Sequence, residues 1–340
     1  MVISGRSVTA LLMTLVTCIA GAASAGVRTA RPETAAAMLA LAQGGDTIVL
    51  APGVYTYLRL GERKFEPALT IDARKAIFSG VVFNDVSGIQ IEGGTFRLPP
   101  PRVDERKGLT DFGVAARMVR MNRITLRNVT FEGPGTAADV PEPKFGEGYG
   151  LFIDQSSDVE VSGGAFSGLV SGVMLRKVRG FKVARNTFRS MRSDGVQVSE
   201  SQGGSIEENN CKLTRIRDSE HPDCIQLWSF STSQPTGDVV IRRNSAEGHT
   251  QGIGMFNHVR KGIDDGGFDR ILIEENDMAV SYSHGIAMNA ARDSIVRNNR
   301  VRTLPGAQHQ AKINIQGDIK RCGNVVQPGA GRPGIKDKAC

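Results

Sequence analysis

The chain has 340 residues, with 42 Lys and Arg against 35 Asp and Glu, which gives a formal net charge of +7 and a pI near 9.3. It is longer than one hydrophobic core usually supports, so a repeat architecture, in which each unit packs only on its neighbours, is favoured. The basic residues are scattered and not clustered. Nucleic acid is therefore not expected as a partner, and the charge fits an anionic glycan better.

The first residues are predicted to be an export signal, residues 1–25. Arg6 supplies the positive start, residues 8–20 form the short apolar stretch, and residues 23–25 fit a small-residue cleavage site. No later stretch approaches about 20 apolar residues, so no membrane span is expected. The sequence thus predicts a secreted or periplasmic protein with one domain over residues 26–340.

Four cysteines remain after the predicted cleavage. Cys322 and Cys340 flank a Gly/Pro-rich tail and are predicted to form a disulfide, which an oxidising compartment permits. Cys211 and Cys224 lack the spacing of a metal site, and we expect them to be buried thiols.

A short strand followed by a turn recurs along the chain. Early copies span residues 89–94, 124–129, 159–164 and 181–186, and later copies end at Asn209, Asn244, Asn276 and Asn299. Consecutive copies are 22 or 23 residues apart where no insertion intervenes, which is typical of one coil of a parallel β-helix. Asn at this turn is expected to adopt left-handed geometry and to bond to its copies in adjacent coils.

A second strand holds the same register as the first. Its copies begin at Gly150, Gly172, Gly195, Cys224, Gly252, Gly285 and Lys312. Their second and fourth positions are apolar and should face the core, so the first and third should face outward. Together the two strands predict an all-β fold, a single-stranded right-handed parallel β-helix of about ten coils.

A helix precedes the first coil. It is predicted to open at Pro32-Glu33-Thr34, to run through Leu41 and to end at Gly44-Gly45, followed by a strand over residues 46–55. We expect this helix to cap the open N-terminal end of the stack. The order of helix, strand and coils resembles the pectate-lyase-like right-handed parallel β-helix superfamily over nearly the whole mature chain. That resemblance implies the fold and leaves the reaction open.

Insertions between coils suggest where the site lies. Extra residues over 215–221, 229–237 and 257–267 attach to neighbouring coils and should form the walls of a groove, since loops on a rigid scaffold often carry function. An earlier insertion over residues 133–148 is expected to wall the other end of this groove.

A column of polar residues runs through these coils, one residue before each second strand. Its members are Tyr149, Ser171, Asp194, Asp223, Gln251, His284 and Ala311. Neighbouring coils lie about 4.8 Å apart, so Asp194 and Asp223 should repel each other, and at least one should have a raised pKa or share a cation. Asp223 lies between two insertions and is predicted to be the centre of the groove.

The two aspartates also resemble a known motif. Residues 193–199, Ser-Asp-Gly-Val-Gln-Val-Ser, and residues 222–224, Pro-Asp-Cys, are similar to the paired aspartate motifs of polygalacturonase-type glycosidases. The resemblance implies that Asp194 and Asp223 position the attacking water. The chain departs from the family at Pro222, where the general acid would stand, and at Gln251, where a histidine belongs.

The function predicted first is that of a polysaccharide lyase acting on a uronate-containing, anionic glycan as a monomer. Its base would be His221, His249, His284 or Lys312, and Asp194 and Asp223 could hold Ca²⁺, as in other lyases of this fold. The catalytic set is then Asp194, Asp223, His221 and His284. The substrate-binding set is Gln197, Gln226, Trp228, His249, Gln251, Lys312 and Asn314.

Three alternatives stay open. A glycoside hydrolase would use Asp194 and Asp223 as acid and base, with His221 as a substitute acid. A glycan-binding protein without catalysis would use Trp228 as a stacking platform. A C5 epimerase would share the chemistry of the lyase.

Overall fold

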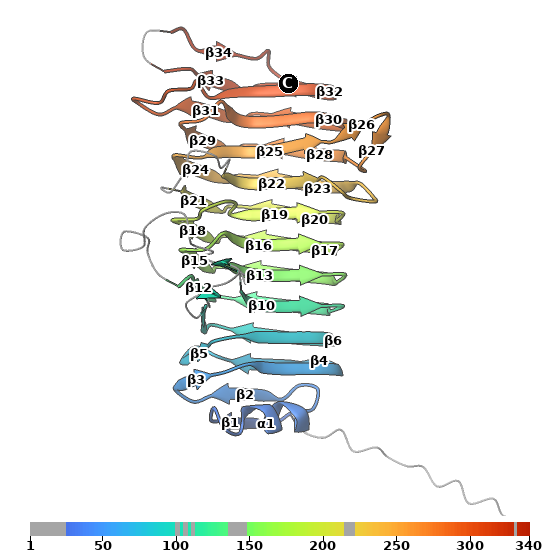
Figure 1. The fold of residues 1–340 in the computed structure, drawn as a ribbon. Coiled ribbons are helices and arrows are strands. Elements are labelled where there is room, and N and C mark those ends of the chain that lie inside the picture. Colours follow the sequence, from blue (N-terminus) through green and yellow to red (C-terminus); the bar gives the residue numbers. More distant parts are fainter. Residues whose placement is uncertain are drawn as a thin grey trace, which may run out of the picture.

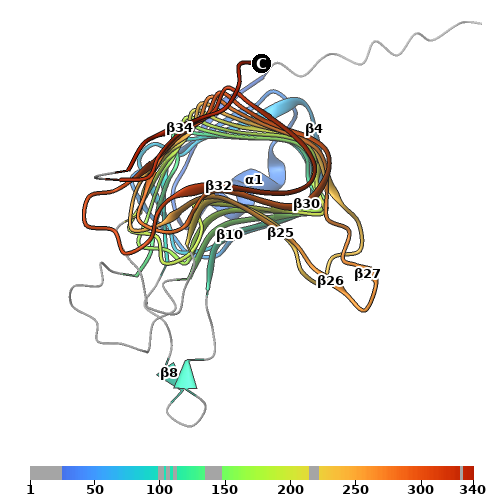
Figure 2. The same cartoon turned by 90° about the horizontal axis from the view of Figure 1, so that it is seen from above.

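The computed structural model describes residues 25–98, 103–104, 108–109, 113–134, 148–213, 222–329 and 332–340. The chain winds into a tall stack of coils (Figure 1), and the coils superpose when viewed along the axis of the stack (Figure 2). The predicted parallel β-helix is confirmed. The predicted signal, apart from Ala25, lies outside the described residues and stays a prediction. No helix in the described part of the chain is long and apolar enough to cross a membrane.

Most coils contribute one strand to each of three faces. The first face holds β10 (Val114–Val119), β13 (Tyr149–Asp154), β16 (Ser171–Arg176), β19 (Val196–Ser199), β22 (Asp223–Ser229) and β25 (Gln251–Asn257). The second face holds β11 (Asn122–Arg127), β14 (Ser157–Ser162), β17 (Arg179–Ala184), β20 (Gln202–Glu207), β23 (Thr236–Arg242) and β28 (Phe268–Glu274). Four long strands bend across both faces: β4 (Leu58–Asp72), β6 (Val81–Glu92), β30 (His284–Arg297) and β32 (Lys312–Cys322).

The third face is a separate sheet of twelve strands within the described residues. It consists of β3 (Gly53–Tyr55), β5 (Ala76–Phe78), β7 (Thr95–Arg97), β12 (Thr130–Glu132), β15 (Ala165–Ser167), β18 (Thr187–Arg189), β21 (Asn210–Leu213), β24 (Ser245–Gly248), β29 (Asp277–Val280), β31 (Arg300–Thr303), β33 (Val325–Gln327) and the antiparallel β34 (Ile335–Lys336). Two short hairpins, β8 (Val103–Asp104) with β9 (Gly108–Leu109) and β26 (Val259–Arg260) with β27 (Ile263–Asp264), project from the stack.

The N-terminal end of the stack carries the predicted capping helix. β1 (Val27–Ala30) and β2 (Thr47–Leu50) pair there, and α1 (Ala35–Leu41) lies across the end of the coils (Figures 1 and 2). The helix begins at Ala35, three residues later than predicted, because Pro32 to Thr34 form a turn. Ala35 and Leu39 are buried against the first coils, so the helix covers core that would otherwise meet water.

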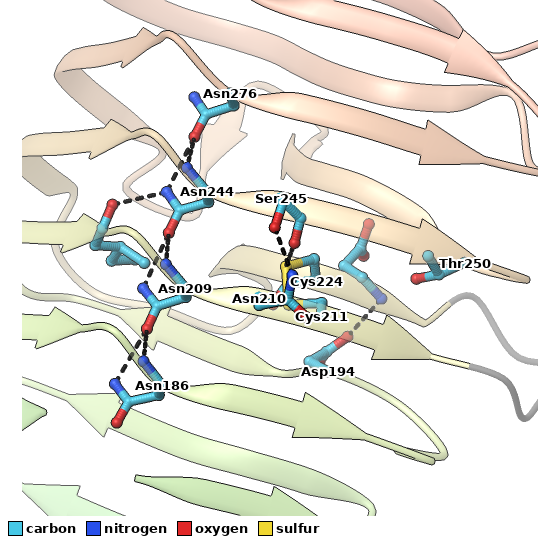
Figure 3. Close-up of a disulfide and its surroundings, with 12 residues drawn as sticks. Asn186, Asp194, Asn209, Asn210, Cys211, Cys224, Asn244, Ser245, Thr250 and Asn276 are labelled. Carbon is cyan, nitrogen blue, oxygen red and sulfur yellow. Dashed lines mark hydrogen bonds between the residues drawn. A yellow bond between two sulfur atoms is a disulfide. The ribbon is translucent and has the colours of Figure 1, made fainter. Parts of the chain in front are cut away.

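A ladder of asparagines runs along one corner of the stack, as Figure 3 shows for four of its members. Asn209 donates from Nδ2 to Oδ1 of Asn244 at 2.9 Å, and Asn244 donates in the same way to Asn276 at 3.0 Å. The ladder consists of Asn186, Asn209, Asn244, Asn276, Asn299 and Asn324, all fully or almost fully buried. The predicted bonding between copies is confirmed.

The predicted left-handed geometry belongs to the residue before each ladder asparagine. Arg185, Glu208, Arg243 and Glu275 have φ between 52° and 58°, whereas the asparagines that follow them do not have positive φ. The prediction was wrong by one position. The ladder asparagines need their backbone N–H to donate to the next Asn side chain, as Asn209 does to Asn244 at 3.0 Å, so the sharp turn is made one residue earlier.

A stack of phenylalanines fills the core behind the third face. Phe96, Phe131, Phe166 and Phe188 follow one another with ring centroids 4.5 to 5.0 Å apart. The glycines that begin the first-face strands make room for them, since a Cβ on Gly172 would lie 2.6 Å from the Phe188 ring. The first position of these strands therefore faces the core, and the prediction that it faces outward was wrong.

The stack ends at a disulfide. Cys211 takes the position after Phe188 in the column, and Cys224 takes the position of the glycine. The two cysteines form a disulfide with their Cα atoms 5.6 Å apart (Figure 3). The prediction of two free thiols was wrong. The phenylalanine column and the glycine column face each other across the core, and both change to cysteine in neighbouring coils, so the disulfide replaces the packing of a phenylalanine ring on a glycine. The predicted Cys322–Cys340 disulfide is confirmed.

We expect the double variant Cys211→Ser, Cys224→Ser to be less stable than the wild type by about 3 kcal/mol, the usual effect of opening a loop of this length. The free energy of unfolding from denaturant titration measures it. The matched control is Cys322→Ser, Cys340→Ser, which opens a loop of similar length at the exposed tail. A loss at the tail larger than that at Cys211–Cys224 would contradict the packing role assigned to the inner bridge.

Candidate functional site

Strand register brings the predicted polar column to one edge of the first face. Asp223 is the direct partner of Gln251, and His284 lies in the same column because Ile253 pairs with Ile286. An irregularity in the pairing of β30 with β32 then places Lys312, and not Ala311, opposite His284. Ala311 is fully buried and the side chain of Lys312 is exposed. The column at the surface therefore ends in a cation.

The column faces outward because each strand begins at a corner. Cys224 and Ile225 are both buried, so the backbone turns between them and the preceding Asp223 lies on the outer side. A Cβ on Gly254, which occupies an outward position, would lie 2.7 Å from Oδ1 of Asp223. The carboxyl of Asp223 thus fills the space that a side chain at Gly254 would need.

Asp194 and Asp223 form a buried pair, with 2 % and 1 % of their surfaces exposed. Oδ1 of Asp194 accepts the backbone N–H of Asp223 at 3.1 Å (Figure 3). Burial raises the pKa of Asp194 to about 7, and burial together with repulsion from Asp194 raises the pKa of Asp223 well above its ordinary value. Both shifts favour the protonated forms, so near neutral pH the pair carries less negative charge than two ordinary aspartates would.

The pair is connected to a row of glutamines on the outer face. Gln226 donates from Nε2 to Oδ2 of Asp223 at 3.1 Å, and its Oε1 accepts from Nε2 of Gln197 at 3.1 Å. Oδ1 of Asp223 and Oε1 of Gln251 are buried acceptors without a hydrogen-bond partner among the residues that the structure describes. A proton on Asp223 would turn one of these acceptors into a donor. Asp223 therefore fixes the orientation of Gln226, whose side chain is partly exposed.

The groups that reach the surface lie at the C-terminal end of the column. The amide of Asn314 lies 2.9 Å from Nδ1 of His284, and the two residues are half-buried. The ring of Phe256 meets the His284 ring edge-on at 5.2 Å between centroids, above the small buried residues Gly254 and Ala287. These side chains line a hollow of about 690 Å³, whose polar lining also includes Asn289 and Gln316. This hollow is the candidate site.

A protein-family model described as a right-handed beta helix region matches residues 79–260 and 171–311. The chain belongs to this right-handed β-helix family. No curated protein matches the chain. Among solved structures, the Streptococcus pneumoniae surface adhesin PfbA is similar at 13 % identity over 86 % of each chain, with a TM-score of 0.50. The GH136 lacto-N-biosidase from Eubacterium ramulus is similar at 12 % identity over 87 % of this chain and 68 % of its own, also with a TM-score of 0.50. At these identities the similarity establishes a shared fold.

Beside the hollow, this right-handed β-helix protein presents a row of rings. Trp228 is 39 % exposed and donates from Nε1 to the carbonyl of Phe230 at 3.0 Å. The Phe230 ring packs edge-on against His258 at 5.0 Å. The two predicted loop walls lie here and contact each other, since Ser231 N–H donates to Asp265 at 3.2 Å. Trp228 and Phe256 both occupy the fifth position of the second-strand repeat, counted from Cys224 and Gly252. In the sheet Trp228 pairs with Phe256, and Phe256 pairs with Asn289, so the row of rings leads into the hollow.

The predicted histidine His249 does not line the hollow. His249 is exposed in the turn after β24, with Nδ1 3.0 Å from Oγ of Ser281. His221 and the insertion over 215–221 lie outside the described residues, as does most of 133–148. The sequence missed Phe256, Asn289 and Gln316, although the register that placed Trp228 and Asn314 could have found them.

The predicted Ca²⁺ site has few ligands in the β-helix protein. Calcium takes six to eight oxygen ligands, whereas one oxygen of Asp194 and one of Asp223 already accept N–H groups. Within the described ranges no three His, Cys, Asp or Glu side chains converge as a metal site would need. These residues do not fit a calcium site.

Proposed function

We propose that this β-helix protein is a secreted polysaccharide lyase that cleaves a uronate-containing glycan by β-elimination. The observation that supports it is the division of the polar column. Asp194 and Asp223 are buried, whereas His284, Asn314 and Lys312 reach the surface beside the hollow. A reacting group must touch the substrate, so the base and the cation at the end of the column are the groups available for catalysis.

In this proposal each of the three residues has a role. His284 removes the proton from C5 of the uronate. The amide of Asn314 holds the ring, because its Nδ2 lies 2.9 Å from Nδ1 of His284. A rotation of this amide by 180° presents its oxygen to Nδ1, which places the imidazole proton on Nδ1 and leaves Nε2 as the base. The ammonium of Lys312 stabilises the negative charge that grows on the substrate carboxylate. The electron pair of the C–H bond forms the C4=C5 double bond, the C4–O bond breaks, and water or Lys312 protonates the leaving oxygen.

The aspartate pair supports this reaction indirectly. Held at least partly protonated, it adds less negative charge beside an anionic substrate than two ionised carboxylates would. It also orients Gln226, and through it Gln197, which can hydrogen-bond to sugar hydroxyls. Asp223 is therefore a positioning residue in this proposal, and not the catalytic centre that the sequence predicted.

Hydrolysis is the second candidate, and the aspartate pair favours it. Two neighbouring carboxyl groups are the usual acid and base of glycosidases, and burial raises the pKa of both Asp194 and Asp223, as a general acid requires. This reaction requires that both carboxyl groups become accessible to the substrate.

One experiment separates the candidates. The secreted protein is incubated with a panel of acidic and neutral polysaccharides, and both ultraviolet absorbance and reducing ends are followed. Elimination produces an unsaturated uronate that absorbs, and hydrolysis produces reducing ends without it. We expect absorbance to rise with the wild type and with Asp223→Asn, whose amide oxygen can still accept from Gln226. Reducing ends without absorbance, lost in Asp223→Asn, would establish hydrolysis. Binding without any cleavage would establish a binding protein.

A further inference from the structure

The outward third position of the first face continues well beyond the candidate site. From Gln226 and Gln197 it passes to Met174 in β16, Phe152 in β13 and Arg117 in β10, each the direct register partner of the next. Three coils separate Phe152 from Gln226, about 14 Å at the usual strand spacing. A glycan that lies along the axis of the stack from the site would therefore pass over Phe152 and Arg117.

Phe152 lies between two guanidinium groups. Arg117 and Arg176 come from the coils on either side, and each guanidinium carbon is 5.7 Å from the centroid of the Phe152 ring. Arg176 also donates to both carboxylate oxygens of Asp154, at 2.8 and 2.7 Å. The ring contact restrains Arg117 at the surface, so less conformational entropy is lost when it binds a ligand.

Arg117 differs from arginines on the neighbouring face of the stack. On the second face, Arg127 pairs with Glu160, Arg242 with Glu207 and Arg297 with Glu274. Arg117 has no carboxylate within 4.0 Å among the described residues, and its side chain is exposed. Asp154 neutralises Arg176, so within the described residues the cluster keeps one positive charge without a paired carboxylate, and that charge belongs to Arg117.

We infer that Arg117, held by Phe152, is a remote subsite that binds a carboxylate of the same glycan chain that is cleaved near His284. The inference rests on the proposed function for the identity of the glycan. A guanidinium matches a carboxylate in two parallel hydrogen bonds, which a lysine or a glutamine does not provide. The subsite therefore recognises a uronate unit, and it makes binding depend on the length of the chain.

The test uses a series of oligouronates from two to eight units and the full-length protein. Arg117→Gln should weaken binding of the longest oligomers about tenfold, the effect expected for a hydrogen-bonded charge, and should leave the shortest unchanged. KM for long substrates should rise with kcat unaltered. Arg117→Lys keeps the positive charge but cannot form the two parallel hydrogen bonds, so its affinity for long oligomers should lie between those of the wild type and Arg117→Gln. The matched control is Arg127→Gln, which removes the same charge from the same coil on the second face.

The outcomes separate this inference from the proposed function. Equal binding of long oligomers by Arg117→Gln and the wild type would overturn the subsite while cleavage stands. Equally weakened binding of long oligomers by Arg117→Gln and Arg127→Gln would also overturn the subsite, because the loss would then follow from the net charge of the protein and not from the position of Arg117. No binding or cleavage of any oligouronate by the wild type would overturn both.

Discussion

Replacement of His284 by glutamine is expected to lower the rate of glycan cleavage by a factor of about 10² to 10⁴, the usual contribution of a general base. His284 borders the 690 Å³ hollow, and Asn314 lies 2.9 Å from its Nδ1. Glutamine has a polar side chain but cannot accept the C5 proton near neutral pH. The initial rate of absorbance increase measures the change, with circular dichroism to establish that the β-helix is intact.

The matched control is His249→Gln. His249 is exposed in the turn after β24 and contacts Ser281, so the variant should cleave at nearly the wild-type rate. Full activity of His284→Gln would remove His284 as the base. An equal loss in both variants would show that neither effect arises from proton transfer at the hollow.

The free energy of unfolding should fall as the pH rises from about 4 to 8, because of the buried aspartates. Burial raises the pKa of Asp194 to about 7, and burial and the neighbouring Asp194 raise that of Asp223 well above its ordinary value. The folded protein thus keeps protons that the unfolded chain has released. This stability is complete below the pKa of an unfolded aspartate, near 4, and is lost as the pH passes the folded pKa. For Asp194 the shift corresponds to an effect on the order of 4 kcal/mol.

Denaturant titrations at pH 5 and pH 8 measure this loss. Carboxylates whose pKa is lowered in the folded protein do not contribute in that window. The pKa of Glu207, for example, is lowered by its hydrogen bond from Lys182, and its contribution is lost only in more acidic solution. The variant Asp194→Asn, Asp223→Asn should show a much smaller difference between the two pH values. Stability that rises from pH 5 to pH 8 in the wild type would contradict the raised pKa values.

Most of the fold could be predicted from the sequence because a coil repeats its physical requirements. The period of 22 or 23 residues, the capping helix and the bonding of the asparagines each reappear in the structure. The errors arose where two columns interact across the core. Cys211 and Cys224 each interrupt a different column, and only their contact behind the third face makes them a pair.

The site was less predictable, because it depends on corners and irregularities. Alternation along a strand could not show that Gly195 and Cys224 turn inward, which moves the preceding aspartates to the outer side. Nor could it show that Asp223 lies against Gly254 with almost no exposed surface. The irregular pairing between β30 and β32 moved Lys312 beside His284, and no periodic pattern predicts such a shift.

Because of the asparagine ladder, a β-helix of this kind can be lengthened by whole coils. Each ladder side chain receives hydrogen bonds from the coil before it and donates to the coil after it, so any coil with the same corner can be inserted between two others. A duplicated coil would restore the ladder at both of its junctions and would lengthen the outer face by one strand spacing, about 4.8 Å. The distance between Arg117 and His284, and with it the length of glycan that spans them, could thus change in evolution by whole coils without a change in either residue.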